Sequence, residues 1–317
     1  MLSDMKISTD FRVHPGAIAV ACEKGGAGKT SLAANLGAAL GATDWGVLLV
    51  DLDPQGNLAG ELGVRDHPDW DQGQKLAEAI TSGVPLQEPT IEHVKPHIDL
   101  VCGGSALGAV LDDTARLVEN PRLFAEILSP LVFGPRGYDY VIIDTPPNSR
   151  FMKSAMVAAR GLVIPLTTDN ESTHSLALMG EWIEEVEQHN PWLTLLGIVQ
   201  SNVDLRSSPW KEQRAYLMEQ FPDEFIDHPI RHSVAAVRAR NAGLQAIEFL
   251  DAAKVAKAAR FETLKTHKKG ETFAPATKSL GDPKAAEKLA QDYLDVITLV
   301  VERLGDVNHK SGYGSEG

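Results

Sequence analysis

The chain is poor in cysteine, and it lacks long apolar runs, internal repeats and low-complexity tracts. Only two cysteines, Cys22 and Cys102, occur among its 317 residues. Two thiolates are too few for an all-cysteine zinc site or iron–sulfur cluster. Both lie in apolar, strand-like segments, so we expect buried free thiols in a reducing cytoplasm. No apolar run approaches the roughly 18 residues that span a bilayer, and residues 1–6 lack a signal-peptide pattern. These absences favour a cytoplasmic protein that is not embedded in a membrane.

Acidic residues outnumber basic ones, and the net charge of −13 argues at first against nucleic-acid binding. The charge is unevenly distributed, however. Residues 230–284 contain eleven Lys/Arg and five Asp/Glu, a local charge of +6 that leaves −19 on the rest of the chain. This asymmetry predicts a basic face that could bind DNA phosphates. The alternative is that Lys254, Lys257 and Arg260 form the solvated side of an ordinary helix.

Apolar, strand-like runs alternate with helix-like runs through most of the chain. This alternation predicts a doubly wound, mostly parallel sheet with helices on both faces. The predicted strands are 17–22, 46–50, 98–102, 140–143, 161–166 and 193–200. The predicted helices are 30–40, 73–81, 121–129, 149–159, 172–188 and 208–220, with a last amphipathic helix over about 283–304.

The segment from Glu23 to Ser31 reads E-K-G-G-A-G-K-T-S, between a predicted strand and a predicted helix. Glycines in this position turn backbone N–H groups toward a phosphate anion. Lys29 would neutralise the β- and γ-phosphates, and the Thr30 hydroxyl would bind Mg²⁺. The predicted nucleotide-binding residues of the loop are Gly25, Gly26, Ala27, Gly28, Lys29, Thr30 and Ser31. The chemistry of Lys24 alone leaves two readings open: a solvated loop residue, or a cation that reaches ATP in a neighbouring subunit.

Acids follow two of the other predicted strands. Asp51 and Asp53 end the run L-L-V-D-L-D-P-Q-G-N, and Asp144 ends V-I-I-D-T-P-P. Asp51 and Asp144 are placed to support Mg²⁺ or its waters. Asp53 could orient or deprotonate the attacking water. Alone, each motif could be an ordinary strand end with turn-forming residues; the phosphate loop upstream favours function.

In order and spacing, these motifs resemble those of the ParA-type partition ATPases, a deviant-Walker group of P-loop NTPases that includes MinD-like proteins. The resemblance covers about residues 15–250 and resumes in the last helix. It implies a slow ATPase that uses ATP and Mg²⁺, forms a homodimer across Lys24, binds DNA non-specifically and works with a ParB-like partner at the nucleoid. It also implies catalytic roles for Lys24, Lys29 and Asp53.

The resemblance extends to two later segments. Asn202, Pro229 and Ile230 would contact adenine, and a turn-forming Asn is the alternative for Asn202. The predicted DNA-binding residues are Arg231, Arg238, Arg240, Lys254, Lys257 and Arg260. The segment 165–172 and the residues before Lys24 depart from the family pattern, which leaves the details of nucleotide contacts open.

We expect a single large α/β domain with these parts: an N-terminal extension (1–16), the ATPase core (17–250), a basic helical insertion (251–283), a C-terminal helix on the core (284–305) and a frayed tail (306–317). Three rival functions remain open. The first is an ATPase of the same scaffold that positions a protein cargo. The second is a MinD-like membrane regulator, disfavoured because the last helix carries several acids and the tail is polar. The third is a metabolic ligase or reductase.

Overall fold

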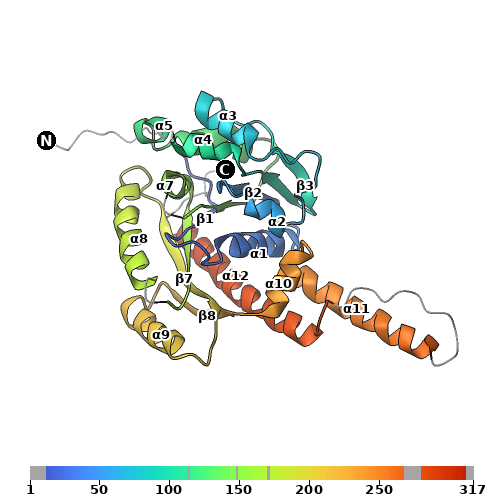
Figure 1. Ribbon diagram of the computed structural model, residues 1–317. Coiled ribbons are helices and arrows are strands. Elements are labelled where there is room, and N and C mark those ends of the chain that lie inside the picture. The colour runs from blue at the N-terminus through green and yellow to red at the C-terminus, as the bar shows by residue number, and fades with distance from the viewer. Residues whose placement is uncertain (1–11, 113–114, 148, 170–171, 268–279, 312–317) are drawn as a thin grey trace.

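The computed structural model describes residues 12–112, 115–147, 149–169, 172–267 and 280–311 (Figure 1). These residues contain an eight-stranded sheet of order β3-β4-β2-β5-β1-β6-β7-β8. The strands are β1 (Ala17–Val20), β2 (Val47–Asp51), β3 (Ile91–Lys95), β4 (Ile98–Val101), β5 (Tyr140–Asp144), β6 (Gly161–Leu166), β7 (Thr194–Val203) and β8 (Phe225–Arg231). All neighbouring strands pair in parallel except β3 and β4, which are antiparallel. The predicted doubly wound, mostly parallel sheet is confirmed.

All six predicted strands are present, and the two strands at the edges of the sheet were not predicted. β3 buries only its first residue well and exposes Glu92 and His93. β8 carries Asp227, His228 and Pro229, which interrupt its apolar pattern. An edge strand needs partners on one side only, so it tolerates proline and charged residues that an inner strand would exclude.

Helices cover both faces of the sheet (Figure 1). They are α1 (Lys29–Gly41), α2 (Asn57–Glu61), α3 (Gln74–Ser82), α4 (Ala106–Asp112), α5 (Ala115–Glu119), α6 (Leu123–Val132), α7 (Arg150–Ala158), α8 (Ser172–Glu187), α9 (Ser208–Gln220), α10 (Val234–Asn241), α11 (Ala246–His267) and α12 (Pro283–Ser311). Alternate side chains of β1 enter opposite cores: Ala17 and Ala19 face α6 and α7, whereas Ile18 and Val20 face α1 and α12.

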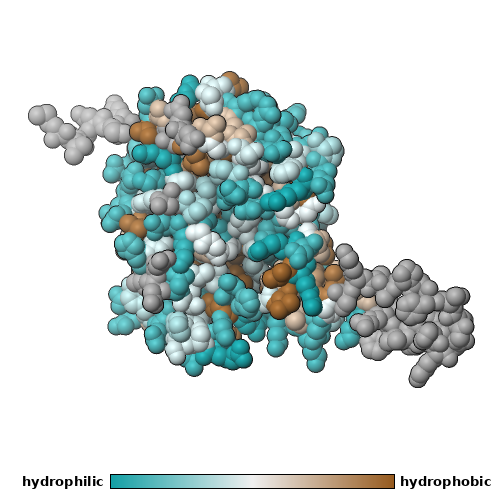
Figure 2. Space-filling view, viewed as in Figure 1, coloured by the Kyte–Doolittle hydropathy of each residue, from teal (hydrophilic) through white to brown (hydrophobic). Residues whose placement is uncertain are grey.

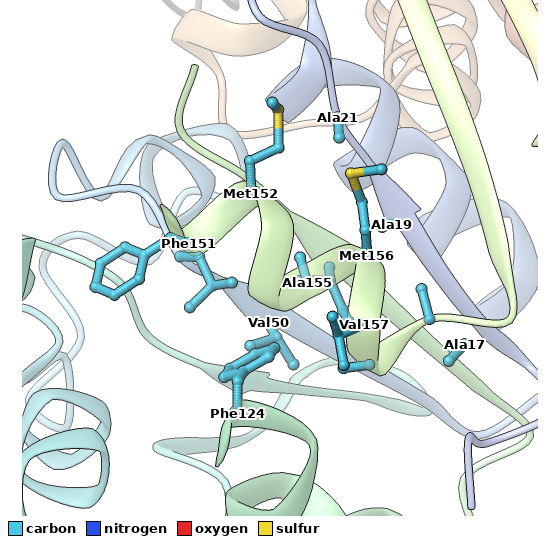
Figure 3. Packing of buried hydrophobic residues seen from close by; sticks show 14 of the residues in the cluster. Ala17, Ala19, Ala21, Val50, Phe124, Phe151, Met152, Ala155, Met156 and Val157 are labelled. Atoms are coloured by element: carbon cyan, nitrogen blue, oxygen red, sulfur yellow. The ribbon is translucent and has the colours of Figure 1, made fainter. Parts of the chain in front are cut away.

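The packing of α7 on β1 shows how the sequence permits a close approach. Figure 3 shows Met156 of α7 close to Ala19 of β1, with Met152 and Ala155 on the same helix and Ala17 further along the strand. Alanines on this face of the strand leave room for the two methionines, which are flexible enough to fill the remaining space. All of these residues are buried. These residues belong to one buried cluster on this face of the sheet.

The C-terminal boundaries differ from the expected ones. α11 begins at Ala246, and Phe249 and Ala253 are buried in the core, so the predicted boundary at 250/251 falls inside a helix. α12 continues to Ser311, beyond the predicted limit at 305. Its last turns are anchored because the buried Arg160 donates hydrogen bonds to Asn308 Oδ1 at 3.0 Å and to the Ser311 hydroxyl at 3.0 Å. Residues 1–11, 268–279 and 312–317 lie outside the described residues; they hold most of the predicted extension, the loop of the predicted insertion and half of the predicted tail.

Both cysteines are buried free thiols, as expected. Among the described residues, every helix is too short or too polar to cross a membrane.

Candidate nucleotide-binding site

The loop between β1 and α1 presents open backbone. Gly26 and Gly28 have φ angles of 77° and 86°, a left-handed conformation that glycine adopts without strain. A Cβ atom on Gly25 or Gly26 would meet nothing within 4 Å. The N-cap residue of α1, Gly28, offers no side-chain cap, and the first turn of α1 has no acid. The first N–H groups of α1 can therefore receive an anion, as they do in phosphate sites.

A cavity of about 1030 Å³ lies in front of this loop. Its lining includes Lys29 and Thr30 of α1, Asp53 after β2, and Pro146 and Pro147 after β5. The strands β2, β5 and β1 are neighbours in the sheet, and ligands of doubly wound folds bind outside the carboxyl ends of such strands. The structure thus brings the predicted phosphate residues and the predicted hydrolytic acid to a single cavity.

A second cavity of about 310 Å³ shares Gly26 and Gly28 with the first and contains part of the predicted adenine site. Asn202 and Ile230 line it, whereas Pro229 lies half-buried in β8 and is not part of the lining. Asn202 has a φ of 56°, and its Oδ1 lies 2.8 Å from His232 Nδ1. Because a carboxamide oxygen only accepts, the His232 nitrogen is the donor. The adenine contacts themselves remain predictions.

The two lysines of the loop have different surroundings. Lys29 is buried, and its Nζ donates to the backbone oxygen of Lys24 at 2.8 Å. Lys24 is partly exposed, and its Nζ lies 2.6 Å from Asp169 Oδ1. Asp169 belongs to the segment after β6 where the sequence departs from the family pattern. Lys24 is therefore held by its own chain here, and its predicted role across a dimer remains a prediction.

Asp144 is fully buried, and neither of its carboxylate oxygens has a hydrogen-bond partner among the described residues. Burial, and then the charge of Asp51, raise the pKa of Asp144 well above its usual range. The Thr30 hydroxyl and the Lys29 ammonium oppose this shift; Thr30 approaches the carboxylate without the geometry of a regular hydrogen bond. An unpartnered buried carboxylate beside a hydroxyl is a fitting place for a cation.

Magnesium fits the residues around Asp144. Oxygen ligands suit this ion, and it usually keeps several waters while binding one or two protein groups and a phosphate. The described residues contain no cluster of three or more His, Cys, Asp or Glu that could hold a metal. Thr30 and Asp144 would therefore hold the ion together with the nucleotide and water.

Asp51 is also buried, but its surroundings differ from those of Asp144. Its Oδ1 accepts the N–H of Asp53 at 2.8 Å, and its Oδ2 accepts the N–H of Leu58 at 3.1 Å. Burial raises the pKa of Asp51 to about 7, although both hydrogen bonds oppose the shift. Its predicted role in supporting Mg²⁺ remains a prediction.

The predicted DNA-binding residues do not share one environment. Arg231 forms an ion pair with Asp292 of α12, at 2.5 Å from Oδ1, and Arg240 pairs with Glu61 of α2 at 2.7 Å. Arg238, Lys254 and Lys257 are exposed on α10 and α11, where Lys254 lies 3.9 Å from Asp251 of its own helix. Arg260 lies in α11, and its side chain falls outside the description. The exposed set is the better candidate for a DNA-binding face.

Sequence reasoning missed several residues of the site. Arg65 and Glu61 line the large cavity. Arg65 bonds to the backbone oxygen of Gly56 at 3.4 Å and to Asn57 Oδ1 at 3.3 Å. Glu61 accepts a hydrogen bond from the Ser31 hydroxyl at 2.7 Å. Neither residue belongs to a sequence motif that we used, so nothing in the sequence indicated that either would line the cavity.

Comparison with known proteins places the chain among partition ATPases. A family model described as an AAA domain matches residues 16–195. The chromosome partitioning protein ParA of Caulobacter vibrioides is 31% identical over 231 residues, which are 71% of this chain and 84% of that protein. The chromosome-partitioning ATPase Soj of Thermus thermophilus is 33% identical over 228 residues, 71% of this chain and 85% of its own length. The solved structure of apo McdA from Cyanothece has a TM-score of 0.62 at 25% identity and covers 72% of this chain and 90% of McdA.

A mostly parallel sheet with an open glycine loop leading from β1 into α1 is the architecture of a P-loop NTPase. The relatives narrow this class, and the chain belongs to the family of ParA-type partition ATPases.

Proposed function

We propose that this protein is an ATP-driven switch for the segregation of plasmid or chromosomal DNA. Two copies, each with ATP and Mg²⁺ bound, close into a dimer in which Lys24 of each reaches the nucleotide of the other. The dimer binds DNA non-specifically at the nucleoid, and a ParB-like partner stimulates hydrolysis and release. Family membership and the observation below support this proposal.

The observation that carries the proposal is the open cavity over the uncapped N-terminus of α1, with Lys29 and Asp53 among its lining residues. The loop N–H groups and the Lys29 ammonium bind and neutralise the phosphates. Asp53 orients water for in-line attack, and its Oδ1 is itself held by the N–H of Gln55 at 2.9 Å. Thr30 and Asp144 would hold Mg²⁺, which would supply positive charge to neutralise the phosphate oxygens. Turnover is slow, because the switch must persist long enough to act.

The surface beside the smaller cavity suits a contact with a second copy. Val234 and Val237 of α10 are 63% and 51% exposed, and Val237 also lines the smaller cavity. Figure 2 shows a hydrophobic patch on an otherwise mostly hydrophilic face in the region of α10. A contiguous exposed apolar patch can mark an interaction surface, and this one lies beside the predicted nucleotide site.

The DNA face is carried by α10 and α11. α11 projects from the body of the molecule (Figure 1), and Lys254 and Lys257 are exposed on it, as Arg238 is on α10. Contacts of these cations with phosphates would make binding independent of sequence and steeply dependent on salt. In a dimer, two such faces would act together on one DNA molecule.

The test is DNA binding with ATP, with ADP and without nucleotide, for the wild type, Lys24→Ala and Asp53→Ala. We expect ATP-dependent binding by the wild type and its loss in Lys24→Ala. Asp53→Ala should keep the ATP-dependent dimer and DNA binding but lose turnover. Lys211→Ala, which removes an exposed lysine from α9, is the matched control and should behave as the wild type. Equal DNA binding in every nucleotide state would contradict the switch.

The same experiment separates the rival functions. If the protein forms ATP-dependent dimers that do not bind DNA, the result would favour the rival function, an ATPase that positions a protein cargo. A MinD-like membrane role needs a terminal helix with a free apolar face. Here Leu289, Tyr293 and Val296 of α12 are buried in the core, which supports the DNA proposal over the membrane one.

A further inference from the structure

The Asp51 carboxylate is joined to both ends of the loop that carries Asp53. Oδ1 accepts the N–H of Asp53 at 2.8 Å, and Oδ2 accepts the N–H of Leu58 at 3.1 Å. Leu58 lies in the first turn of α2, so one side chain spans the whole turn from the end of β2 to the start of that helix. Asp53, in the middle of this arrangement, is the acid that faces the nucleotide cavity.

Asp51 is also closed off from the cavity. Its residue exposure is 1%, and it is not among the residues that line the cavity. A Cβ atom on Gly103 would lie 2.7 Å from Asp51 Oδ1, so the backbone after β4 covers the carboxylate directly. On the other side of the turn, a Cβ on Gly56 would lie 3.2 Å from Gly104. The turn is therefore packed against a second glycine-rich segment that leaves no space for side chains.

Asp51 and Asp144 differ in the hydrogen-bond partners of their carboxylates. The two acids are opposite each other in the register of β2 and β5, and both are buried. Asp144 has two oxygens without partners among the described residues, whereas both oxygens of Asp51 are engaged by backbone donors. Each oxygen of Asp51 already accepts one backbone N–H, whereas the oxygens of Asp144 accept none, so Asp144 is the better placed of the two acids for a cation.

We propose that Asp51 is a positioning residue that acts through Asp53, and not a metal residue. It holds the backbone of Asp53 at the distance and angle that in-line attack by water requires. Arg65 supports the same turn from outside through the backbone oxygen of Gly56. The inference rests on the proposed hydrolytic role of Asp53, but the hydrogen bonds themselves can be tested without hydrolysis.

The direct test is amide hydrogen exchange at Asp53 and Leu58 in the full-length protein. Both amides should be protected without nucleotide or Mg²⁺, and Mg²⁺ with ADP should leave the protection unchanged. In Asp51→Asn, the side-chain NH₂ cannot accept a hydrogen bond, so at least one of the two amides should exchange about tenfold faster. If Mg²⁺ removes the protection in the wild type, the carboxylate has turned to the ion and the proposal is wrong.

The second readout is kinetic and uses Asp99→Asn as the matched control. Asp99 is a buried acid of β4 that also accepts two hydrogen bonds, from His93 N–H and the Tyr138 hydroxyl, each at 2.7 Å. Asp51→Asn should lower kcat for ATP about tenfold to a hundredfold, because a small displacement of the reacting groups is enough. The Mg²⁺ concentration at half-maximal activity and the KM for ATP should change less than about twofold, since neither ligand touches Asp51.

Asp99→Asn should leave kcat unchanged. A parallel rise in the required Mg²⁺ concentration would overturn the positioning role, as would an unchanged kcat in Asp51→Asn with the protection lost. If the wild type shows no ATPase activity at all, the proposed function fails, while the exchange data still decide whether Asp51 holds the turn.

Discussion

Lys24 Nζ lies 2.6 Å from Asp169 Oδ1, so an acid of the same chain holds the lysine that the proposed dimer would send to its partner. The side chains of Lys24 and Asp169 are 30% and 39% exposed, which leaves the pair accessible and weak enough to exchange. Lys24 is further tied to the phosphate loop, because its backbone oxygen accepts a hydrogen bond from Lys29 Nζ. A phosphate that binds the Lys29 ammonium would break this hydrogen bond. The backbone of Lys24 would then be free to move.

We expect Asp169→Asn to favour the ATP-dependent dimer, since it removes a competitor for Lys24. A partly exposed pair contributes about 0.2–1 kcal/mol, which is up to about fivefold in the dimer dissociation constant for each lysine released. Analytical ultracentrifugation with non-hydrolysed ATP analogue measures the change. Glu181→Gln, which removes an exposed acid from α8, is the control. A weaker dimer in Asp169→Asn would show that Asp169 supports the interface.

The ion pair between Arg240 and Glu61 should show asymmetric costs when its members are removed singly. The Glu61 side chain is only 10% exposed, whereas that of Arg240 is 58% exposed. Arg240→Gln leaves a buried carboxylate without its cation and should lower the free energy of unfolding by about 1–3 kcal/mol. Glu61→Gln leaves an exposed guanidinium that water can solvate, so it should cost less. Urea unfolding of both single variants and of the double variant gives the coupling free energy between Arg240 and Glu61. Arg238→Gln, which removes an exposed arginine of α10, is the control. Equal losses of unfolding free energy in the two single variants would contradict this account.

The position of the glycine loop between β1 and α1, and of the acids at the strand ends, could be predicted from the sequence because the residues that form them are adjacent in the chain. The strand β1, the glycines after it and the helix α1, which begins at Lys29, follow one another along the chain. The same holds for Asp144, which ends an apolar run. The family and the parallel sheet follow from these local patterns and are confirmed.

The partners of these residues could not be predicted, because the fold alone brings them near. Arg240 is 179 positions from Glu61, and Arg231 is 61 positions from Asp292. An arginine that pairs with an acid of another helix looks the same in the sequence as one that faces DNA. For that reason the predicted basic face includes Arg231 and Arg240, which pair with acids of other helices, beside Arg238, Lys254 and Lys257 on the exposed sides of α10 and α11. The β8 strand was missed for a related reason: its pairing with β7 overrides the poor strand propensity around Pro229.

Asp144→Asn should stabilise the protein without Mg²⁺ and abolish stabilisation by Mg²⁺. Burial raises the pKa of Asp144 in the folded protein, so folding favours the protonated acid and becomes less favourable as the pH rises and the carboxylate ionises. The neutral amide should therefore raise the free energy of unfolding by about 1–3 kcal/mol at pH near 8, and by less at pH near 5. Unfolding curves at both pH values, with EDTA or with Mg²⁺ and ADP, measure this. Asp99→Asn, which removes an acid with two partners, should instead destabilise. A destabilised Asp144→Asn at high pH would mean that the carboxylate has a partner in solution.

The stability of the N-terminal end of the sheet should fall in mild acid because of His14. Its Nδ1 accepts the N–H of Gly16 at 3.1 Å, and its ring lies 5.6 Å from that of Phe133. Burial is the largest influence and lowers the pKa of His14 from its ordinary 6.5, against smaller opposing effects of Tyr138 and Asp139. The folded protein thus binds this proton less well than the unfolded chain, so the contribution of His14 to stability is present above pH 6.5 and is lost as the pH falls below it.

His14→Asn offers Oδ1 in place of Nδ1 and cannot be protonated. Urea unfolding between about pH 7.5 and about pH 5 should show a smaller loss of stability in the variant than in the wild type, and parallel losses would rule out His14 as the source.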